Sequence, residues 1–415
     1  MSPTARVAVL LALAGLSVLV VSLPVALGLV AVVALVTAVD WSYARRRPLV
    51  AREAPAVAAR GVPADLRVEV VVGPAVQARV RQPRPADVGI EPAEAAVGLD
   101  AELRARRRGR HILPPVVVRA TGPLRLARQD HTVGAGHEVQ VYPDLPNARR
   151  LAHQVRTGRF RDPGERPRGP RGLGTEFETI RDYQPDDDVR QINWRATDRL
   201  QRPMSNQFRE DTERDVVCAV DAGRLMAAPI GERTRLDIAL DAVAAVAAVA
   251  DVVGDRCGAV AFDAGTLVER PPARRAGREV VDALYDLEPS DLDSDYEHAF
   301  ATLGRAKRAL VMVFTDLLDD AAARPLLEAM PVLTRRHAVV VVSVLDDHID
   351  TAAGAAPTDA GGAYAMAAAL AALAVREAAV ANLTRRGATV VQGAADSLPA
   401  RCVGAYLRLK SRARI

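Results

Sequence analysis

Lysine, aromatic residues and cysteine are all scarce in this chain of 415 residues. Lysine occurs only at Lys307 and Lys410, so nearly every positive charge is an arginine, and aromatic residues make up 4% of the sequence. Surfaces that bind nucleic acid usually combine a basic face with interleaved aromatic rings. Because aromatic rings are few and the net charge is only +4, the composition argues against a nucleic-acid-binding protein.

The three cysteines exclude a disulfide framework and a cysteine-ligated metal site. Cys218, Cys257 and Cys402 are odd in number, far apart, and set in apolar surroundings without the short spacing that metal ligands require. We expect them to be small buried hydrophobic groups in a reducing compartment.

The length and the remaining composition indicate a folded protein of two or three domains, since 415 residues exceed one ordinary core. Apolar residues account for 49% of the chain and charged residues for 26%. Such proportions are typical of globular proteins and argue against extensive disorder.

A long apolar stretch opens the chain, because residues 7–39 contain no charged side chain. As one unbroken helix it would measure about 50 Å, against a hydrocarbon core of about 30 Å. Pro24 lies in the middle of the stretch and cannot donate a hydrogen bond to the preceding turn. We therefore predict that residues 1–44 form a transmembrane helical hairpin with its turn at residues 22–24. A single tilted or kinked span is the alternative.

The flanking residues predict the orientation of this hairpin. Arginines at positions 45–47 follow the apolar stretch, and Trp41 and Tyr43 are ring types that favour the membrane interface. Positive charge beside a span tends to stay in the cytoplasm, so we expect a cell-membrane protein whose soluble domains are cytoplasmic. A cleaved signal peptide fits less well, because a second apolar run stands where polar sequence should follow a cleavage site.

Residues 50–145 are predicted to form a small β-sandwich. Leu66, Val68 and Val70 alternate with Arg67 and Glu69, the period of a strand with one buried face. Short apolar runs recur between glycine, proline and aspartate residues, and no helical pattern of comparable strength appears in this region.

Residues 158–214 contain a linker followed by a charged signature segment. Proline, glycine and arginine dominate residues 161–172, and acids and arginines then alternate through residues 174–199. Arginine pairs with carboxylates through two parallel hydrogen bonds, so this segment can hold one shape without a large core. We predict that this segment forms a structural network, and a partner-docking surface is the alternative. For either role the residues are Glu176, Arg181, Tyr183, Asp187, Asp188, Arg190, Trp194 and Arg199.

Catalysis by the acids of this segment is not favoured. Each acid has an arginine close in sequence, and such a neighbour stabilises the charged carboxylate instead of raising its pKa toward neutrality. We expect no catalytic residue in the chain.

Residues 215–415 show the pattern of a doubly wound α/β domain. The apolar run 216–220 ends at Asp221 and is typical of a strand buried on both faces. Alternating strands and helices predict a parallel sheet whose carboxyl ends bind ligands or partners. Residues 354–362 are rich in small residues and are expected to form a loose loop. The other strands are expected at 259–262, 309–315, 338–344 and 388–391, and the helices at 236–253, 278–287, 295–307, 321–336 and 365–386.

The signature segment resembles a known family, the one catalogued as domain of unknown function fifty-eight. The resemblance rests on the run G-x-E-F-x-x-x-R-x-Y-x-P-x-D-D-x-R-x-I-x-W at residues 174–194, followed by Ala196 and Arg199. The family usually has glycine where this chain has Asp186 and aspartate where it has Asn193. The resemblance extends over nearly the whole chain and implies a C-terminal domain similar to von Willebrand factor A-type domains.

That second resemblance implies a metal site which this chain has lost in part. A-type domains bind Mg²⁺ with the motif D-x-S-x-S at the first strand end and an aspartate at a later one, which correspond to Asp221 and Asp316 here. Gly223 and Leu225 replace the two serines, and Arg224 lies between them. We expect no metal, with Arg224 neutralising Asp221 or Asp316. The residues that could supply the middle-loop ligand are Ser290, Ser294 and Asp295.

The sequence thus predicts a mixed α/β and β protein with four parts, at residues 1–44, 50–145, 158–214 and 215–415. We expect a membrane-anchored, non-enzymatic scaffold or adaptor without a cofactor. The family resemblance implies a MoxR-type AAA+ ATPase as its protein partner, in the assembly or maturation of a complex. The alternative is a metal-dependent hydrolase using the acidic clusters, but the sequence offers no nucleophile–base pair, phosphate-binding glycine loop or histidine near the acids.

Overall fold

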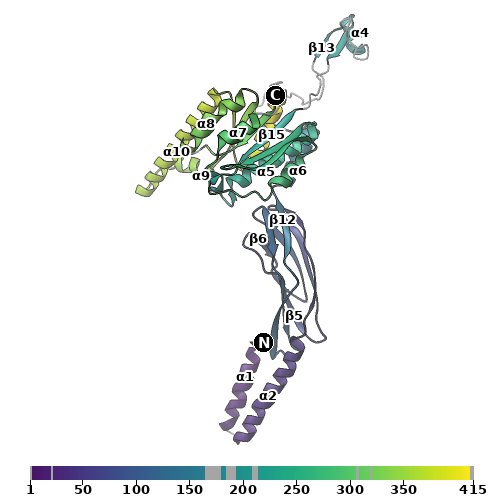
Figure 1. Ribbon diagram of the computed structural model, residues 1–415. Helices are drawn as coiled ribbons and strands as arrows, with labels where there is room; N and C mark the ends of the chain where they lie inside the picture. Colours follow the sequence, from purple (N-terminus) through teal and green to yellow (C-terminus); the bar gives the residue numbers. More distant parts are fainter. Residues whose placement is uncertain are drawn as a thin grey trace. The chain divides into compact units, whose positions relative to one another are not determined.

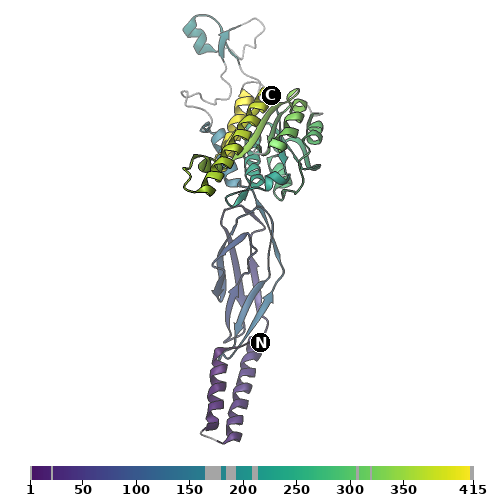
Figure 2. The same cartoon turned by 90° about the vertical axis from the view of Figure 1, so that its left-hand side faces the viewer.

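The computed structural model describes residues 2–19, 22–163, 179–183, 193–207, 214–304, 308–317 and 320–411. The chain is a mixed α/β protein that divides into two compact units (Figures 1 and 2). The first unit is Met1–Asp144 and the second is Leu145–Ile415.

The first unit begins with two apolar helices, α1 (Ala5–Leu16) and α2 (Leu23–Ala44), which lie side by side (Figures 1 and 2). Pro24 stands in the first turn of α2, where no backbone donor is needed, so it starts a second helix instead of kinking a single one. The predicted pair of helices is therefore present, but residues 23 and 24 belong to the second helix and not to the turn. By length and composition alone, α2 and a helix of the second unit, α10 (Ala360–Arg385), are long and apolar enough to cross a membrane. Core helices of soluble proteins and signal sequences pass the same test.

Three sheets make up the rest of the first unit. One has the order β2 (Leu49–Glu53), β4 (Ala64–Val71), β8 (Gly98–Ala105) and β6 (Val88–Glu91). The second has the order β1 (Ser2–Pro3), β11 (Ala127–Val133), β10 (Val116–Thr121), β5 (Gln77–Arg81) and β7 (Glu94–Ala96). The third has the order β3 (Val57–Ala59), β12 (His137–Tyr142) and β9 (Gly109–Leu113).

These sheets share one apolar core. On β4 the side chains of Leu66 and Val68 are buried and those of Arg67 and Glu69 are exposed, as the alternation predicted. Val80 from β5 and Val118 from β10 enter the same core from the five-stranded sheet. Each strand therefore has one inward face, the arrangement that a period of two produces.

The second unit contains a six-stranded sheet whose order reverses at its centre. The order is β19 (Thr266–Arg274), β18 (Arg256–Phe262), β15 (Asp215–Asp221), β20 (Leu310–Phe314), β21 (Ala338–Leu345) and β22 (Thr389–Ala394). All neighbours are parallel except β19, which is an antiparallel edge strand. The first strand of this sheet in the sequence is β15, and later strands are added on both sides of it. The switch point therefore lies between β15 and β20, where such sheets bind ligands.

Helices cover both faces of this sheet (Figure 1). On one face α5 (Arg235–Val253) contacts α3 (Leu145–Arg156), α6 (Gly277–Leu284) and α11 (Leu398–Ser411). On the other face α8 (Asp320–Thr334) contacts α7 (Tyr296–Gly304) and α10. The loop predicted at 354–362 is present but shorter, since residues 355–359 join α9 (Asp347–Gly354) to α10 and the remaining predicted positions are helical.

Candidate functional site

The two acids expected at the strand ends lie at the switch point. Asp221 is the last residue of β15, and Asp316 follows the end of β20 by two residues. The ladder pairs Val220 with Phe314, so the two strand ends are neighbours. Both acids are buried, with 2% of Asp221 and 5% of Asp316 exposed. Buried carboxylates must find partners inside the protein, because desolvation of an unpartnered charge is costly.

Asp221 finds four hydrogen-bond donors. Its Oδ1 accepts from the backbone N–H of Gly223 at 2.8 Å and from the hydroxyl of Ser294. Its Oδ2 accepts from the hydroxyl of Tyr296 at 2.7 Å and from that of Thr315 at 2.7 Å. Both oxygens of the carboxylate are therefore engaged by the protein's own donors, and three of the four donors are hydroxyl groups.

Tyr296 is fixed in place by an aromatic cluster. Its ring makes edge contacts with the rings of Phe262 and Phe300, with centroid separations of 5.6 and 5.9 Å. Burial and the charge of Asp221 raise the pKa of Tyr296 well above its ordinary value. Tyr296 consequently keeps its proton and remains a donor to Asp221 at neutral pH.

Asp316 is paired with Arg235, the first residue of α5, and both side chains are buried. The sequence pointed instead to Arg224 as the cation that neutralises the acids, and this part of the prediction needs correction. Arg224 has 53% of its side chain exposed and forms its ion pair with Asp293. The backbone N–H of Arg224 donates to the carbonyl of Leu292 at 2.9 Å, which directs this residue toward the outer loop.

The close packing around Gly223 disfavours a side chain at this position. A Cβ atom at residue 223 would overlap the hydroxyl of Ser294 and approach the carbonyl oxygen of Leu292 to 2.9 Å. Of the three candidates for the middle loop, Ser294 is the one whose side chain contacts Asp221. Ser294 thus occupies the space that a side chain at position 223 would need.

The oxygen atoms around Asp221 and Asp316 do not fit a tightly bound Mg²⁺ ion. Such an ion requires an octahedral shell of oxygen ligands, whereas the oxygens of Asp221 accept hydrogen bonds and Asp316 faces a guanidinium group. Positions 223 and 225, where the resemblance to A-type domains implies serine hydroxyls, are glycine and leucine. Across the part of the chain that the structure describes, no group of three histidine, cysteine, aspartate or glutamate residues could hold a metal ion.

The loop at residues 290–295 forms an exposed rim over this buried cluster. Its backbone is tied to the strand ends, because Ser290 N–H donates to Ala222 at 2.7 Å and Asp295 N–H donates to Asp263 at 2.8 Å. Between these anchors Leu292 is 53% exposed, and the adjacent Asp293 pairs with Arg224. A fixed loop therefore presents an apolar side chain and an ion pair to the solvent.

The described part of the signature segment forms a small antiparallel pair with a helix. Strands β13 (Thr179–Asp182) and β14 (Met204–Gln207) pair, and α4 (Trp194–Leu200) lies between them in the chain. The side chain of Asn193 accepts a hydrogen bond from the backbone N–H of Ala196 at 3.0 Å and so caps the helix. Asparagine and aspartate cap equally well, which explains why asparagine serves where the family usually has aspartate.

Trp194 is not a buried anchor, because 70% of the residue is exposed. In the described part of the segment the buried side chains are the smaller Ala196 and Met204. Arg199 is exposed and Tyr183 is half-buried. An exposed tryptophan is what the docking alternative expected of this segment.

The rest of the predicted network stays a prediction. Glu176, Asp187, Asp188 and Arg190 lie outside the described residues, and Arg181 is described only by its backbone, which pairs with Ser205 in β14. Sequence reasoning also missed Arg235, Tyr296 and Thr315, three residues of the buried cluster.

The fold and the site define a mixed α/β protein with a doubly wound sheet and a hydrogen-bonded carboxylate at its switch point. Comparison with known proteins agrees with the resemblance over this part of the chain. Residues 179–353, from β13 through the switch point to the end of α9, match a family described as "Protein of unknown function DUF58".

Similar curated proteins occur in mycobacteria. Uncharacterized proteins of Mycobacterium tuberculosis and Mycobacterium bovis are 28% identical to this chain over 183 residues. The match covers 42% of this chain and 56% of each relative. The chain therefore spans about half the length of the curated relatives it matches.

Proposed function

We propose that this protein is a non-enzymatic, membrane-anchored adaptor that docks a protein partner at the rim of its six-stranded sheet. The observation that carries this proposal is the contrast at the switch point. The carboxylate of Asp221 is committed to four internal donors, whereas the loop above it exposes Leu292 and the Arg224–Asp293 pair. A rigid rim with an apolar centre and polar surroundings is a common form of protein-docking surface.

The chemistry of the buried cluster supports docking over catalysis. Ser294 is the serine of the cluster, and serine hydroxyls can act as nucleophiles when a base such as histidine activates them. The hydroxyl of Ser294 instead donates to the carboxylate of Asp221. Tyr296 and Thr315 act as donors to the same carboxylate. These groups hold one another in place, which is a structural role.

The order of the sheet supports a likeness of the second unit to von Willebrand factor A-type domains. By order of appearance in the chain the strands are arranged 3-2-1-4-5-6, with an antiparallel strand at one edge. In this proposal the rim at residues 290–295 occupies the place where A-type domains bind their partners, without the metal ion.

The class of partner follows from the family resemblance, which implies a MoxR-type AAA+ ATPase. The adaptor would hold this ATPase at the cell membrane while a complex is assembled or matured. Helices α1 and α2 are the proposed anchor, and the arginines at 45–47 favour a cytoplasmic location for both soluble parts.

A binding measurement with a defined partner tests this function. The full chain is held in lipid nanodiscs, and its affinity for a purified MoxR-type ATPase from the same organism is measured by interferometry with and without ATP. Leu292→Asp should weaken binding at least tenfold, because a buried charge replaces an apolar contact. The control is Leu267→Asp, which changes an exposed leucine on the edge strand β19. Absence of binding, or equal affinities for the two variants, would contradict the proposal.

The same assay examines the signature segment. Trp194→Ala should leave the folding stability within about 0.5 kcal/mol of the unmodified chain, as expected for exposed positions. A loss of affinity on this background would place Trp194 in the docking surface. Unchanged affinity would confine docking to the rim.

A further inference from the structure

The end of α2 is locked to the turn between β10 and β11. Asp40, in the last turns of α2, is 1% exposed. Its carboxylate accepts hydrogen bonds from the backbone N–H groups of Leu124 at 2.7 Å, Leu126 at 2.8 Å and Ala127 at 2.9 Å. At Gly122 a Cβ atom would overlap the carboxyl group of Asp40, so the turn approaches the helix as closely as glycine permits.

The residues just before α1 hold the same turn. Thr4, which precedes α1, donates from its backbone to the carbonyl of Leu126 at 2.9 Å and from its hydroxyl to that of Arg125 at 2.7 Å. The preceding strand β1 pairs with β11, with Ser2 opposite Arg128. The β10–β11 turn is therefore held by both chain segments that enter and leave the helical pair.

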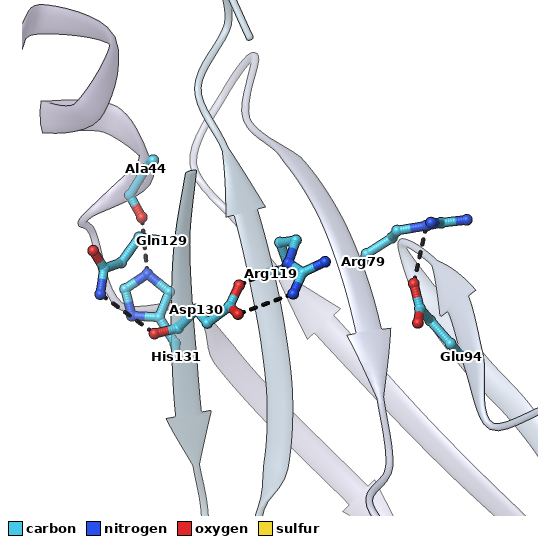
Figure 3. A network of polar contacts seen from close by, with 7 residues as sticks. All are labelled: Ala44, Arg79, Glu94, Arg119, Gln129, Asp130 and His131. Atoms are coloured by element: carbon cyan, nitrogen blue, oxygen red, sulfur yellow. Dashed lines mark hydrogen bonds and ion pairs between the residues drawn. The ribbon is translucent and has the colours of Figure 1, made fainter. Parts of the chain in front are cut away.

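We call the contact of Thr4 and residues 40–44 with the β10–β11 turn the joint. Side chains of β11 complete it (Figure 3). The ring of His131 forms a hydrogen bond of 2.8 Å with the carbonyl of Ala44, the last residue of α2. The indole N–H of Trp41 donates to Gln129 at 3.3 Å. Asp130, the acid on the exposed side of β11, is paired with Arg119 of β10 at 2.8 Å.

The segments that form the joint carry exposed arginines and exposed apolar side chains. Leu124 is 53% exposed at the tip of the turn. The guanidinium groups of Arg45 and Arg46 lie 5.3 and 5.7 Å from the ring centres of Trp41 and Tyr43, the ring types that favour membrane interfaces. The exposed arginines of the joint are Arg6, Arg45, Arg46, Arg47, Arg125 and Arg128.

We propose that this joint is a binding surface for anionic phospholipid headgroups. The proposal rests on the membrane anchor of the proposed function, because the joint lies where α1 and α2 would emerge from the bilayer. The guanidinium groups would pair with headgroup phosphates, and Leu124 would enter the boundary of the acyl chains. The fixed turn makes Arg125 and Arg128 part of this surface although they lie about 80 residues beyond α2 in the chain.

Brominated lipids test this proposal on the full chain. Trp194→Phe leaves Trp41 as the only tryptophan, and its fluorescence then reports the lipids beside the joint. The protein is reconstituted in phosphatidylcholine vesicles that contain a small, equal fraction of either brominated phosphatidylglycerol or brominated phosphatidylcholine. One arginine near an anionic membrane surface strengthens binding to that surface about fivefold. We expect phosphatidylglycerol to quench Trp41 at least about twice as strongly as phosphatidylcholine.

Matched variants assign the effect to the turn. In Arg125→Gln/Arg128→Gln the quenching ratio should fall toward one. The control Arg84→Gln/Arg104→Gln removes two exposed arginines from the same unit, at the opposite end of the sheets, and should keep the ratio of the unmodified chain. High salt should lower the ratio of the unmodified chain, a readout that does not depend on the folding of any variant.

The outcomes separate this inference from the proposed function. If the full chain is released from vesicles by alkaline carbonate, the membrane anchor itself fails. If the chain stays in the vesicles but the ratio is one and insensitive to salt, the anchor stands and the headgroup surface is overturned. An equal fall of the ratio in both double variants would overturn it as well.

Discussion

Asp40 in the first unit and Asp221 in the second are both almost fully buried carboxylates, but they are satisfied by different kinds of donor. Asp40 accepts from three backbone N–H groups of one turn. Asp221 accepts from three hydroxyls and one backbone N–H, which come from three separate parts of the chain. Backbone donors are fixed by the path of the chain, whereas hydroxyl donors can rotate toward other acceptors.

The two carboxylates therefore differ in how freely their surroundings can rearrange. The turn at Asp40 has its three amides directed at one carboxylate, and backbone amides cannot rotate toward another acceptor as hydroxyls can. The cluster at Asp221 retains alternatives, since the hydroxyls of Tyr296 and Thr315 already lie 2.8 Å apart. We infer that removal of Asp40 costs more stability than removal of Asp221, and substitution of each aspartate tests this comparison.

The largest loss is expected for Asp40→Ala. Two buried amides and the partly buried amide of Leu124 lose their acceptor, at about 1–3 kcal/mol for each buried group, so we expect the free energy of unfolding to fall by about 3–5 kcal/mol. Chemical denaturation in detergent micelles measures it. Asp40→Asn keeps one carbonyl acceptor and should lose clearly less. A loss below about 1 kcal/mol for the alanine variant would remove the basis of the comparison.

Asp221→Ala should have a smaller effect, about 2–3 kcal/mol, because only one fixed amide is left without its acceptor while the hydroxyls can pair with each other. The same denaturation experiment on the same preparation gives the difference directly. If Asp221→Ala proved more destabilising than Asp40→Ala, the distinction between backbone and hydroxyl donors would be wrong.

Gly223→Ser should cost about 1–3 kcal/mol, because the new side chain overlaps Ser294. Adding Ser294→Gly opens the space, so the double variant should be more stable than the sum of the two single losses predicts. Thermal unfolding of the four proteins of this cycle is the measurement. Strict additivity would show that the close contact at Gly223 does not determine which residue stands there.

The smallest expected effect is a pH dependence of the stability of the second unit. Burial lowers the pKa of His337 in the second unit, and its Nδ1 accepts from the backbone of Ala309 at 3.2 Å. Below the ordinary histidine pKa of about 6.5 the unfolded chain binds a proton that the folded chain refuses. Stability of the second unit should therefore be complete above this pH and decline as the pH falls.

His337→Gln should flatten this decline between neutral and mildly acidic pH. The change should be smaller than the three losses above, and denaturation curves collected across this range reveal it. An unchanged slope would mean that other groups control the acid sensitivity of the second unit.

Regular elements were predictable because their patterns are local. The alternation at Leu66 and Val68 and the continuous apolar run of β15 both correspond to observed strands. Helix α5 ends before Gly254, whose φ of 77° suits glycine at a helix end. The edge strand β19 was missed because Pro271 and Pro272 interrupt its pattern, although an edge strand tolerates proline.

The site was predictable only in part. Strand ends located Asp221 and Asp316, since a parallel sheet brings the ends of neighbouring strands together. The cation of Asp316 could not be chosen by proximity in sequence, because Arg235 comes from another element while Arg224 follows β15 directly. The exposure of Trp194 depends on tertiary contacts, which no local pattern records.

The central claim is that the oxygens of Asp221 are held by the protein's own donors and not by a metal ion. Calorimetric titration of the detergent-solubilised full chain with Mg²⁺, alongside Asp221→Asn, tests it most directly. We expect no saturable heat at micromolar Mg²⁺ in either protein, and a melting temperature that a chelator leaves unchanged. Saturable micromolar binding to the unmodified chain that disappears in Asp221→Asn would contradict the claim and establish a working metal site at the switch point.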